Sequence, residues 1–288
     1  MAGEVLAVGA KVEGFKAGDR VMGIVGGGAY AEISRIDYRM AMPIPEGLDF
    51  VHAAAIPEVF VTAHEALLHL GHLHAGETVL IHAGAGGVGS ATIQLAHAAG
   101  ATVFATTQAN KLDAVRDFGA DHAIDYQNED FAEAVAKATH GRGVDVIIDF
   151  IGAPYLERNI RSLADGGRLI QVGIMGGVKN AALPLERLLY GHLKIIGTVM
   201  KSRPQHVKHA MVRRFGDRWL PHVATGGLTP VVDSVFDLSQ AADAHRRMES
   251  GLSVGKIILS THEMSAAVLT SRLPAPNAPQ SFQADSLP

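Results

Sequence analysis

The chain has 288 residues, of which 48% are hydrophobic and 19% charged, a composition typical of a globular protein. A formal net charge of −4 excludes a basic field that would attract nucleic acid or an anionic membrane, and no apolar run reaches membrane-spanning length. The absence of cysteine excludes disulfides, thiolate nucleophiles and cysteine-ligated zinc. Because the first residues lack the features of a signal peptide, we expect a cytoplasmic protein that binds neither nucleic acid nor membrane.

The first fifty residues show no helical periodicity. Three stretches separated by glycine turns, residues 3–12, 18–28 and 29–36, have the character of short strands in a small antiparallel barrel. The proline-containing residues 42–48 lead out of it as an extended segment. We therefore expect a partial barrel domain over residues 1–58.

The middle of the chain, residues 59–202, repeats one unit. Short β-branched apolar runs alternate with segments that have helical periodicity, which is typical of a parallel sheet covered on both faces. Six such runs predict an α/β fold with a doubly wound, six-stranded parallel sheet of the dinucleotide-binding (Rossmann) kind. The expected strands are residues 78–82, 102–107, 122–126, 143–150, 167–173 and 193–199.

The first of these units contains a glycine-rich turn. Gly84, Gly86 and Gly89 have G-x-G-x-x-G spacing, between a strand and a helix. In this motif the first glycine permits the turn, the second lets the backbone approach a pyrophosphate, and the third lets helix and strand pack closely. The free N–H groups of the helix start attract phosphate. The turn therefore predicts a bound dinucleotide.

The end of the second strand indicates which dinucleotide binds. NAD-binding proteins usually place a carboxylate there, whereas this chain has Thr106, Thr107 and Gln108, and Lys111 follows. A lysine near uncharged hydroxyls suits a 2′-phosphate, which a carboxylate would repel. We therefore expect NADPH as the cofactor. The alternative is that Lys111 is an ordinary solvated helix lysine.

The histidines do not have the spacing of a metal site. His64 and His69 resemble the helical zinc motif, but they are five residues apart, which places them about 140° apart around a helix. His69, His72 and His74 surround Gly71, where we expect a helix to end. We expect solvated histidines and no metal.

The last part of the chain returns to a different pattern. Residues 203–261 contain helical stretches and a late strand at residues 253–260, which we expect to rejoin the first region, so that the barrel domain is discontinuous. Residues 262–288 combine prolines and small polar residues without periodicity, which predicts a disordered tail.

Residues 76–97, GETVLIHAGAGGVGSATIQLAH, closely resemble the signature of the zeta-crystallin-like NADPH:quinone oxidoreductases. These are zinc-free members of the medium-chain dehydrogenase/reductase superfamily, whose second domain is a GroES-like β-barrel. Gln94 matches the signature, while His97 stands where the family usually has lysine, arginine or serine. Further matches at residues 18–21, 27–32, 53–63, 143–152 and 255–259 extend the resemblance over most of residues 3–259.

The resemblance implies roles for individual positions. The turn would hold the pyrophosphate, Lys111 and Tyr126 would flank the 2′-phosphate, and other positions would line the nicotinamide half of the cleft. Lys201 replaces the first arginine of a pair that the family usually has, and Arg203 keeps the second; lysine supplies charge but not the planar fork. The expected cofactor-binding residues are Thr62, Gly84, Ala85, Gly86, Gly87, Val88, Gly89, Thr106, Thr107, Lys111, Tyr126, Gly152, Gly173, Met175, Lys201 and Arg203.

The family also has a substantial segment before the part that matches residue 3, including the first barrel strands and a substrate-facing loop. We therefore expect an incomplete GroES-like barrel. Catalytic residues are not assignable from the sequence, although Glu58 and His64 are polar residues near the expected domain junction. We expect an NADPH-dependent quinone reductase; the alternatives are an enoyl-type reductase of activated C=C bonds and an NADPH-binding protein without turnover.

The family commonly pairs two cofactor domains through the sixth strand. Residues 193–199 supply an apolar candidate for that edge. The resemblance therefore implies a homodimer that reduces a small quinone or enone.

Overall fold

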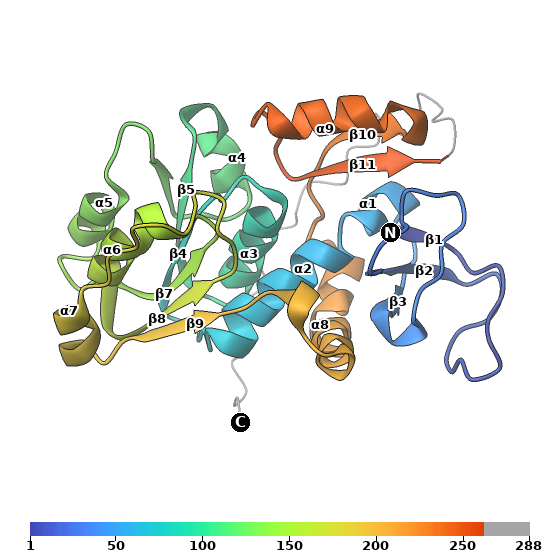
Figure 1. Cartoon of the computed structure of the whole chain (residues 1–288), viewed down its shortest axis with the longest axis horizontal. Helices are drawn as coiled ribbons and strands as arrows, with labels where there is room; N and C mark the ends of the chain where they lie inside the picture. The colour runs from blue at the N-terminus through green and yellow to red at the C-terminus, as the bar shows by residue number, and fades with distance from the viewer. Residues whose placement is uncertain (262–288) are drawn as a thin grey trace.

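The computed structural model describes residues 1–261, and the tail expected at residues 262–288 lies outside the described residues. A cofactor-type α/β domain lies beside a smaller part that contains both the first and the last described strands (Figure 1). Between them run the long helix α8, Gln205–Ala224, and the helix α2, Pro57–His64. No helix within residues 1–261 is long and apolar enough to cross a bilayer.

The six-stranded parallel sheet is confirmed. Its strand order is β6-β5-β4-β7-β8-β9, and every pair of neighbours is parallel. The order reverses between β4 and β7, which is where this kind of sheet opens a crevice for ligands. The strands are β4 Thr78–Ile81, β5 Thr102–Thr107, β6 His122–Asp125, β7 Val144–Asp149, β8 Leu163–Gln171 and β9 Lys194–Gly197.

Both faces of the sheet are buried, as near-continuous apolar strands require. Alternate residues of β7 pack on opposite faces of the sheet: Val146 and Ile148 belong to one hydrophobic cluster, and Ile147 belongs to the other. The first cluster includes residues of α3, and the second includes residues of α5 and α6. The connecting helices are α3 Gly87–Ala98, α4 Leu112–Asp117 with the short 3-10 turn η3 Ala109–Lys111, α5 Phe131–Ala138, α6 Ala153–Ser162 and α7 Leu185–Tyr190.

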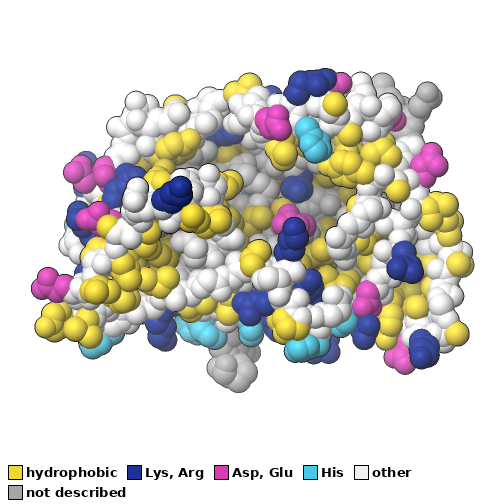
Figure 2. Space-filling model, viewed as in Figure 1, with side chains coloured by type: hydrophobic (Ala, Val, Ile, Leu, Met, Phe, Trp, Pro, Cys, Tyr) yellow, Lys and Arg dark blue, Asp and Glu magenta, His cyan; other side chains and the backbone are white. Residues whose placement is uncertain are grey.

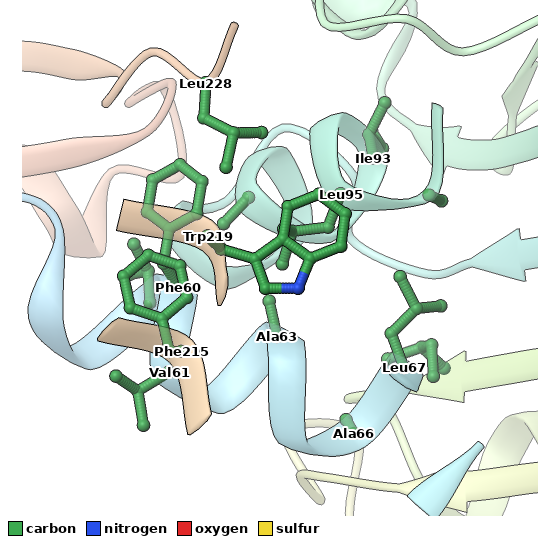
Figure 3. Packing of buried hydrophobic residues seen from close by; sticks show 14 of the residues in the cluster. Phe60, Val61, Ala63, Ala66, Leu67, Ile93, Leu95, Phe215, Trp219 and Leu228 are labelled. Carbon is green, nitrogen blue, oxygen red and sulfur yellow. The ribbon is translucent and has the colours of Figure 1, made fainter. Parts of the chain in front are cut away.

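Helices α2, α3 and α8 share one apolar core (Figure 3). Phe60 of α2 lies 5.8 Å, centroid to centroid, from Phe215 of α8, and both rings are buried. Trp219, one turn after Phe215, lies next to Ala63 of α2. A π-helical turn, η2 Glu65–Leu70, continues α2 and ends at Gly71, the helix end expected from the sequence. This core fixes α2 against the start of α3, where the glycine turn lies.

The N-terminal part is less regular than predicted. Its three short strands, β1 Ala2–Glu4, β2 Arg20–Gly23 and β3 Ala41–Pro43, form one antiparallel sheet, followed by the short helix α1 Phe50–Ala54. The strand expected at residues 29–36 is wrong. Both edges of β2 are already paired, by β1 and by β3, and Ile33 is 72% exposed. Neither a ladder partner nor burial therefore stabilises an extended strand there. A 3-10 turn, η1 Tyr38–Met40, precedes β3.

The last strand does not pair with this sheet, which corrects part of the expectation. β11, Lys256–Ser260, pairs in parallel with β10, Val232–Asp237, and α9, Ala241–Glu249, connects them. Consecutive β, α and β elements favour this local parallel pairing. β11 nevertheless contacts α1, which in turn packs against β1 and β2 (Figure 1). The two remaining 3-10 turns are η4 Met200–Ser202 and η5 Leu238–Gln240.

Candidate functional site

The glycine turn connects β4 to α3 at the carboxyl end of the sheet. Gly84 N donates to Thr106 O at 2.9 Å, which ties the turn to the neighbouring strand β5. Ala83 has a φ of 50°, a conformation that alanine rarely adopts. The N-cap of α3 is Gly86, which has no capping side chain. The first N–H groups of α3 therefore face the open end of the sheet without a side-chain acceptor.

The three motif glycines have different neighbours. A Cβ on Gly89 would lie 2.3 Å from Ala83 O and 2.9 Å from Gly84 Cα, so this glycine serves helix–strand packing. A Cβ on Gly84 would contact three side chains at 3.0 to 3.3 Å. A Cβ on Gly86 would approach only Ala83 O, at 3.3 Å. Gly86 therefore leaves room on the side where a ligand would approach, which agrees with the role expected of the second glycine.

The ends of the neighbouring strands bring most predicted site residues to this edge. Thr106 and Thr107 end β5, and Tyr126 directly follows β6, where its N–H donates to Thr107 O. Gly152 caps α6 after β7 with a φ of 93°, and Gly173 follows β8. Because these strands are parallel neighbours, their carboxyl ends form one continuous rim. The arrangement fits an extended ligand that lies across the switch between β4 and β7.

A buried polar chain lies beneath this rim. His82, at the end of β4, is completely buried; its Nδ1 is 3.0 Å from Thr106 Oγ1 and its Nε2 is 2.7 Å from Asn159 Oδ1. Asn159 Nδ2 donates to Asp149 Oδ2 at 3.1 Å, and Asp149 accepts the N–H groups of Ile151 and Gly152. The chain links the ends of β4, β5 and β7 to the Gly152 turn. It therefore fixes the shape of the rim.

Protonation states follow from these contacts. Since Asn159 Oδ1 is an acceptor, His82 Nε2 carries the proton, and Nδ1 accepts from the Thr106 hydroxyl. Burial lowers the pKa of His82 to about 4, which keeps the ring neutral. Burial also raises the pKa of Asp149, partly opposed by the N–H groups that it accepts. These polar residues at strand ends were missed by the sequence reasoning, although a histidine and an aspartate that end apolar strands are visible signals.

Lys111 has a different environment from the one expected. Lys111 is only 8% exposed, and its Nζ donates to Gly251 O at 2.6 Å and to Ser253 O at 2.8 Å. Burial lowers its pKa, while the nearby Asp233 opposes that shift. Tyr126, at 39% exposure, lies near Gln108, whose Nε2 is 3.5 Å from the tyrosine hydroxyl. In this structure Lys111 thus joins the cofactor-type domain to the loop before β11.

The remaining predicted residues lie on α2 and in the segments that follow β8 and β9. Thr62 is half-buried on α2, and Met175, in the loop after β8, is 70% exposed. Lys201 is exposed in the turn after β9, and Arg203 donates to Thr198 Oγ1 at 3.2 Å. Figure 2 shows a hollow on this face between the α/β domain and the β10–β11 part, with a basic and an acidic side chain inside it.

The two polar residues considered for catalysis have separate environments. Glu58 Oε2 lies 3.7 Å from Lys256 Nζ, a pair that the sequence does not reveal because it joins distant segments. His64 is 5% exposed against Phe215, and its Nδ1 has no hydrogen-bond partner. Burial lowers the pKa of His64 to about 4, with the nearby Arg214 contributing. His64 therefore belongs to the helix core rather than to the rim, and the expectation that it is solvated is wrong.

The sheet's opposite end carries a separate cavity of about 460 Å³. Glu77 and Arg168 form its central ion pair, 2.8 Å between Oε2 and Nη2, just before β4 and within β8. It lies at the amino ends of the strands and has no contact with the glycine turn. The glycine turn and the strand-end residues described above lie at the opposite, carboxyl end of the sheet.

Comparisons with protein families match two parts of the chain. Residues 1–46 match the alcohol dehydrogenase GroES-like domain, and residues 87–216 match the zinc-binding dehydrogenase family. Curated relatives include the highly-reducing polyketide synthase 1 of Aureobasidium melanogenum, 34% identical over 264 residues, which is 90% of this chain and 12% of that protein. The phthioceranic/hydroxyphthioceranic acid synthase of Mycobacterium tuberculosis is 32% identical over 99% of this chain and 13% of that protein. The chain thus spans about an eighth of the length of these relatives.

Solved structures are similar over most of their length. An NAD-dependent alcohol dehydrogenase is 33% identical with a TM-score of 0.80, covering 91% of this chain and 81% of its own. The apo JamJ enoyl reductase is 27% identical with a TM-score of 0.80, covering 90% and 78% respectively. A mycobacterial protein complexed with NADPH is 29% identical with a TM-score of 0.79, covering 90% and 80%.

Proposed function

Because this chain belongs to the medium-chain dehydrogenase/reductase superfamily of NAD(P)H-dependent oxidoreductases, we propose that it binds NADPH and reduces an activated C=C bond of the enoyl type. The observation that carries this proposal is the likeness to enoyl reductases of solved structure, joined to a glycine turn open at Gly86. Polyketide synthases, which recur among the curated relatives, support the same acceptor class. The quinone reductase expected from the sequence is the second candidate.

The residues present fit the dinucleotide. Gly86, Gly87 and Val88 would hold the pyrophosphate, because no side chain caps the start of α3 and no Cβ covers Gly86. Thr107 and Tyr126 would flank the adenosine half, and the end of β5 carries no carboxylate that would repel a 2′-phosphate. Gly152, Gly173 and Thr62 would line the nicotinamide half. Bound there, NADPH would supply the hydride.

A resident zinc does not fit, despite the name of the matching family. The chain has no cysteine, and residues 1–261 contain no group of three potential histidine or carboxylate ligands close enough to hold a metal ion. The protein's own contribution is therefore positioning. The Asp149–Asn159–His82–Thr106 chain holds the rim rigid, and the N–H groups that Asp149 accepts fix the Gly152 turn.

One observation favours a quinone as acceptor. The loop after β8 carries three exposed apolar side chains and no acid: Ile174 at 58%, Met175 at 70% and Val178 at 62% exposure. Hydride addition to an enoyl thioester leaves a carbanion equivalent that needs a proton at the neighbouring carbon, whereas a quinone forms a stable hydroquinone anion that solvent can protonate. An apolar wall suits a flat conjugated ring such as that of a quinone.

A panel of acceptors distinguishes these activities. We expect the purified chain to oxidise NADPH with an enoyl thioester faster than with ortho- or para-quinones, because the enoyl reductases are its structural relatives. NADPH absorbance is followed with each acceptor, after calorimetry has established binding. Faster turnover with quinones would reverse the order of the two candidates. Binding without turnover would favour a cofactor-binding protein.

We also propose a homodimer through β9. This strand ends the sheet and has no neighbour on its outer edge among residues 1–261; Ile195 is 40% exposed, and Leu189 and Tyr190 of α7 are 67% and 73% exposed. An apolar sheet edge is an efficient pairing surface for a second copy.

Light scattering should give twice the chain mass of 30.3 kDa, and Ile195→Glu should shift the protein towards monomer. Ile33→Glu, at a distant isoleucine that is 72% exposed, should not. A monomeric wild type would contradict this interface.

A further inference from the structure

The cavity at the amino ends of the strands has the size of a small-molecule site. Its volume of about 460 Å³ lies within the range of such sites, roughly 300 to 1,000 Å³. Gly166 of β8 forms part of the wall, and a Cβ there would meet nothing within 4 Å. Beside this glycine and the central pair of Glu77 and Arg168, the lining residues are Leu70, His72, His74, Lys194 and Ile196.

Arg168 occupies the acceptors around the cavity. Its Nη1 and Nη2 donate to the two carboxylate oxygens of Glu77 at 2.9 and 2.8 Å. Its Nε donates to Gly71 O and its Nη2 to His72 O, both at 2.8 Å. Glu77 Oε2 also accepts the N–H of His74 at 2.9 Å. The carboxylate and two carbonyl groups of the wall are therefore already bonded to donors of the protein itself.

The polar side chains that stay free in the lining are donors. Within residues 1–261, Lys194 Nζ has neither an ion pair nor a hydrogen bond, and the rings of His72 and His74 have no hydrogen-bonded partner. Each imidazole can donate an N–H. Asp165 of β8 is already paired with Arg187 at 2.7 Å. Because the central pair is neutral, the cavity keeps one unbalanced positive charge.

The backbone of His72 is held in an unfavourable conformation. Its φ of 46° is uncommon for a residue other than glycine. The bond from Arg168 to the His72 carbonyl holds the residue there, and the ring lines the cavity. Backbone strain of this kind is concentrated at binding and catalytic sites.

Leu70 and Ile196 supply an apolar wall, and both pack against the first hydrophobic cluster. In the β8–β9 register, Ile196 is paired with Ile170 of that cluster. Strand alternation then places Lys194 on the same face, where η2 packs, and Ile195 on the other. A ligand in the cavity would therefore lie on the opposite face of β9 from the Ile195 side chain.

We propose that this cavity is a second ligand site, which binds a small organic monocarboxylate. Lys194 would pair with the carboxylate, His72 and His74 would donate to it, and the apolar part of the ligand would lie on Leu70 and Ile196. Since one free ammonium balances one negative charge, a phosphate dianion would keep an uncompensated charge. The inference goes beyond the proposed function, because the cavity lies at the other end of the sheet from the glycine turn.

Hexanoate is the probe, titrated into ¹⁵N-labelled protein and followed by NMR. We expect a dissociation constant of about 1 mM, as is reasonable for eight non-hydrogen atoms. The amide signals of His72, His74 and Lys194 should shift, while those of residues 84–89 in the glycine turn should not. Acetate has four fewer methylene groups and leaves the apolar wall uncovered, so it should bind about tenfold more weakly or worse.

Lys194→Met tests the charge, because methionine keeps the apolar stem of the lysine. The loss of one charge-assisted contact should weaken hexanoate binding about tenfold. Lys137→Met is the matched control, at an exposed lysine of α5, and should bind hexanoate like wild type.

Equal binding of hexanoate to wild type and Lys194→Met would overturn the inference, and so would amide shifts confined to the glycine turn. The same measurement with hexylamine and with inorganic phosphate tests the ligand class. Hexylamine that binds as tightly as hexanoate would contradict an anion site, and phosphate that binds more tightly would contradict a monocarboxylate site.

Discussion

Replacing Gly89 by alanine should strongly destabilise the fold, whereas replacing Gly86 by alanine should leave the fold intact. The new methyl at position 89 would lie 2.3 Å from Ala83 O and 2.9 Å from Gly84 Cα, and backbone atoms cannot move aside as a flexible side chain can. Overpacking against rigid neighbours costs several kcal/mol, roughly 4 or more here, which is a large part of a typical domain's stability. Urea unfolding followed by circular dichroism measures the loss.

The Gly86→Ala variant separates folding from binding. Its φ of −74° is ordinary for alanine, and the methyl would meet only Ala83 O at 3.3 Å, so we expect a stability change of about 1 kcal/mol or less. NADPH affinity should nevertheless fall by about tenfold or more, because the methyl would stand where the backbone approaches the pyrophosphate. A Gly86→Ala protein that binds NADPH like wild type would contradict the location of the site.

Stability should fall as the pH falls from about 7 to about 5, before most carboxylates titrate. His64 and His82 both have a pKa lowered to about 4 by burial, below the value near 6.5 of an unfolded histidine. The unfolded chain therefore binds more protons than the folded chain in this range. Protonation linked to each histidine lowers the free energy of unfolding by about 2 kcal/mol between pH 7 and pH 5. The raised pKa of Asp149 acts in the opposite direction, and the lowered pKa of His69 acts in the same direction. Urea unfolding at several pH values gives the slope.

His64→Leu is the control for this prediction. The variant removes a buried histidine whose Nδ1 has no partner, and leucine fills much of the same apolar space. The stability lost between about pH 7 and about pH 5 should therefore shrink by about 2 kcal/mol. An unchanged pH slope in His64→Leu would show that this histidine does not titrate in the expected range.

The sequence was sufficient for the elements whose pattern is local. The six β/α units were predicted from apolar runs such as residues 143–150, which contrast with the helical periodicity of the segments between them. The strand predicted at residues 29–36 was wrong because a sequence with strand character forms a strand only where a partner edge and a buried face exist. The pairing of β11 with β10 instead of the first strands likewise depends on which neighbour is available in three dimensions.

The candidate site likewise combines features that the local sequence predicts with features that depend on tertiary contacts. The glycine turn was visible because spacing alone encodes its backbone requirements. The contact of Lys256 with Gly87 joins residues far apart in the chain, so no local signal predicts it. The engagement of Lys111 with Gly251 and Ser253 is of the same kind. Local motifs thus locate the turn, while the charges around it depend on tertiary contacts.

Isotope transfer tests the central claim most directly, which is that a hydride held at this turn reaches an acceptor. The chain is incubated with NADPH that carries deuterium at the transferable position of the nicotinamide, together with an enoyl thioester or a quinone, and the products are analysed by mass spectrometry and NMR. The account predicts deuterium at the β-carbon of the saturated thioester and oxidised cofactor in equal amount. Bound NADPH that keeps all its deuterium with every acceptor would contradict it.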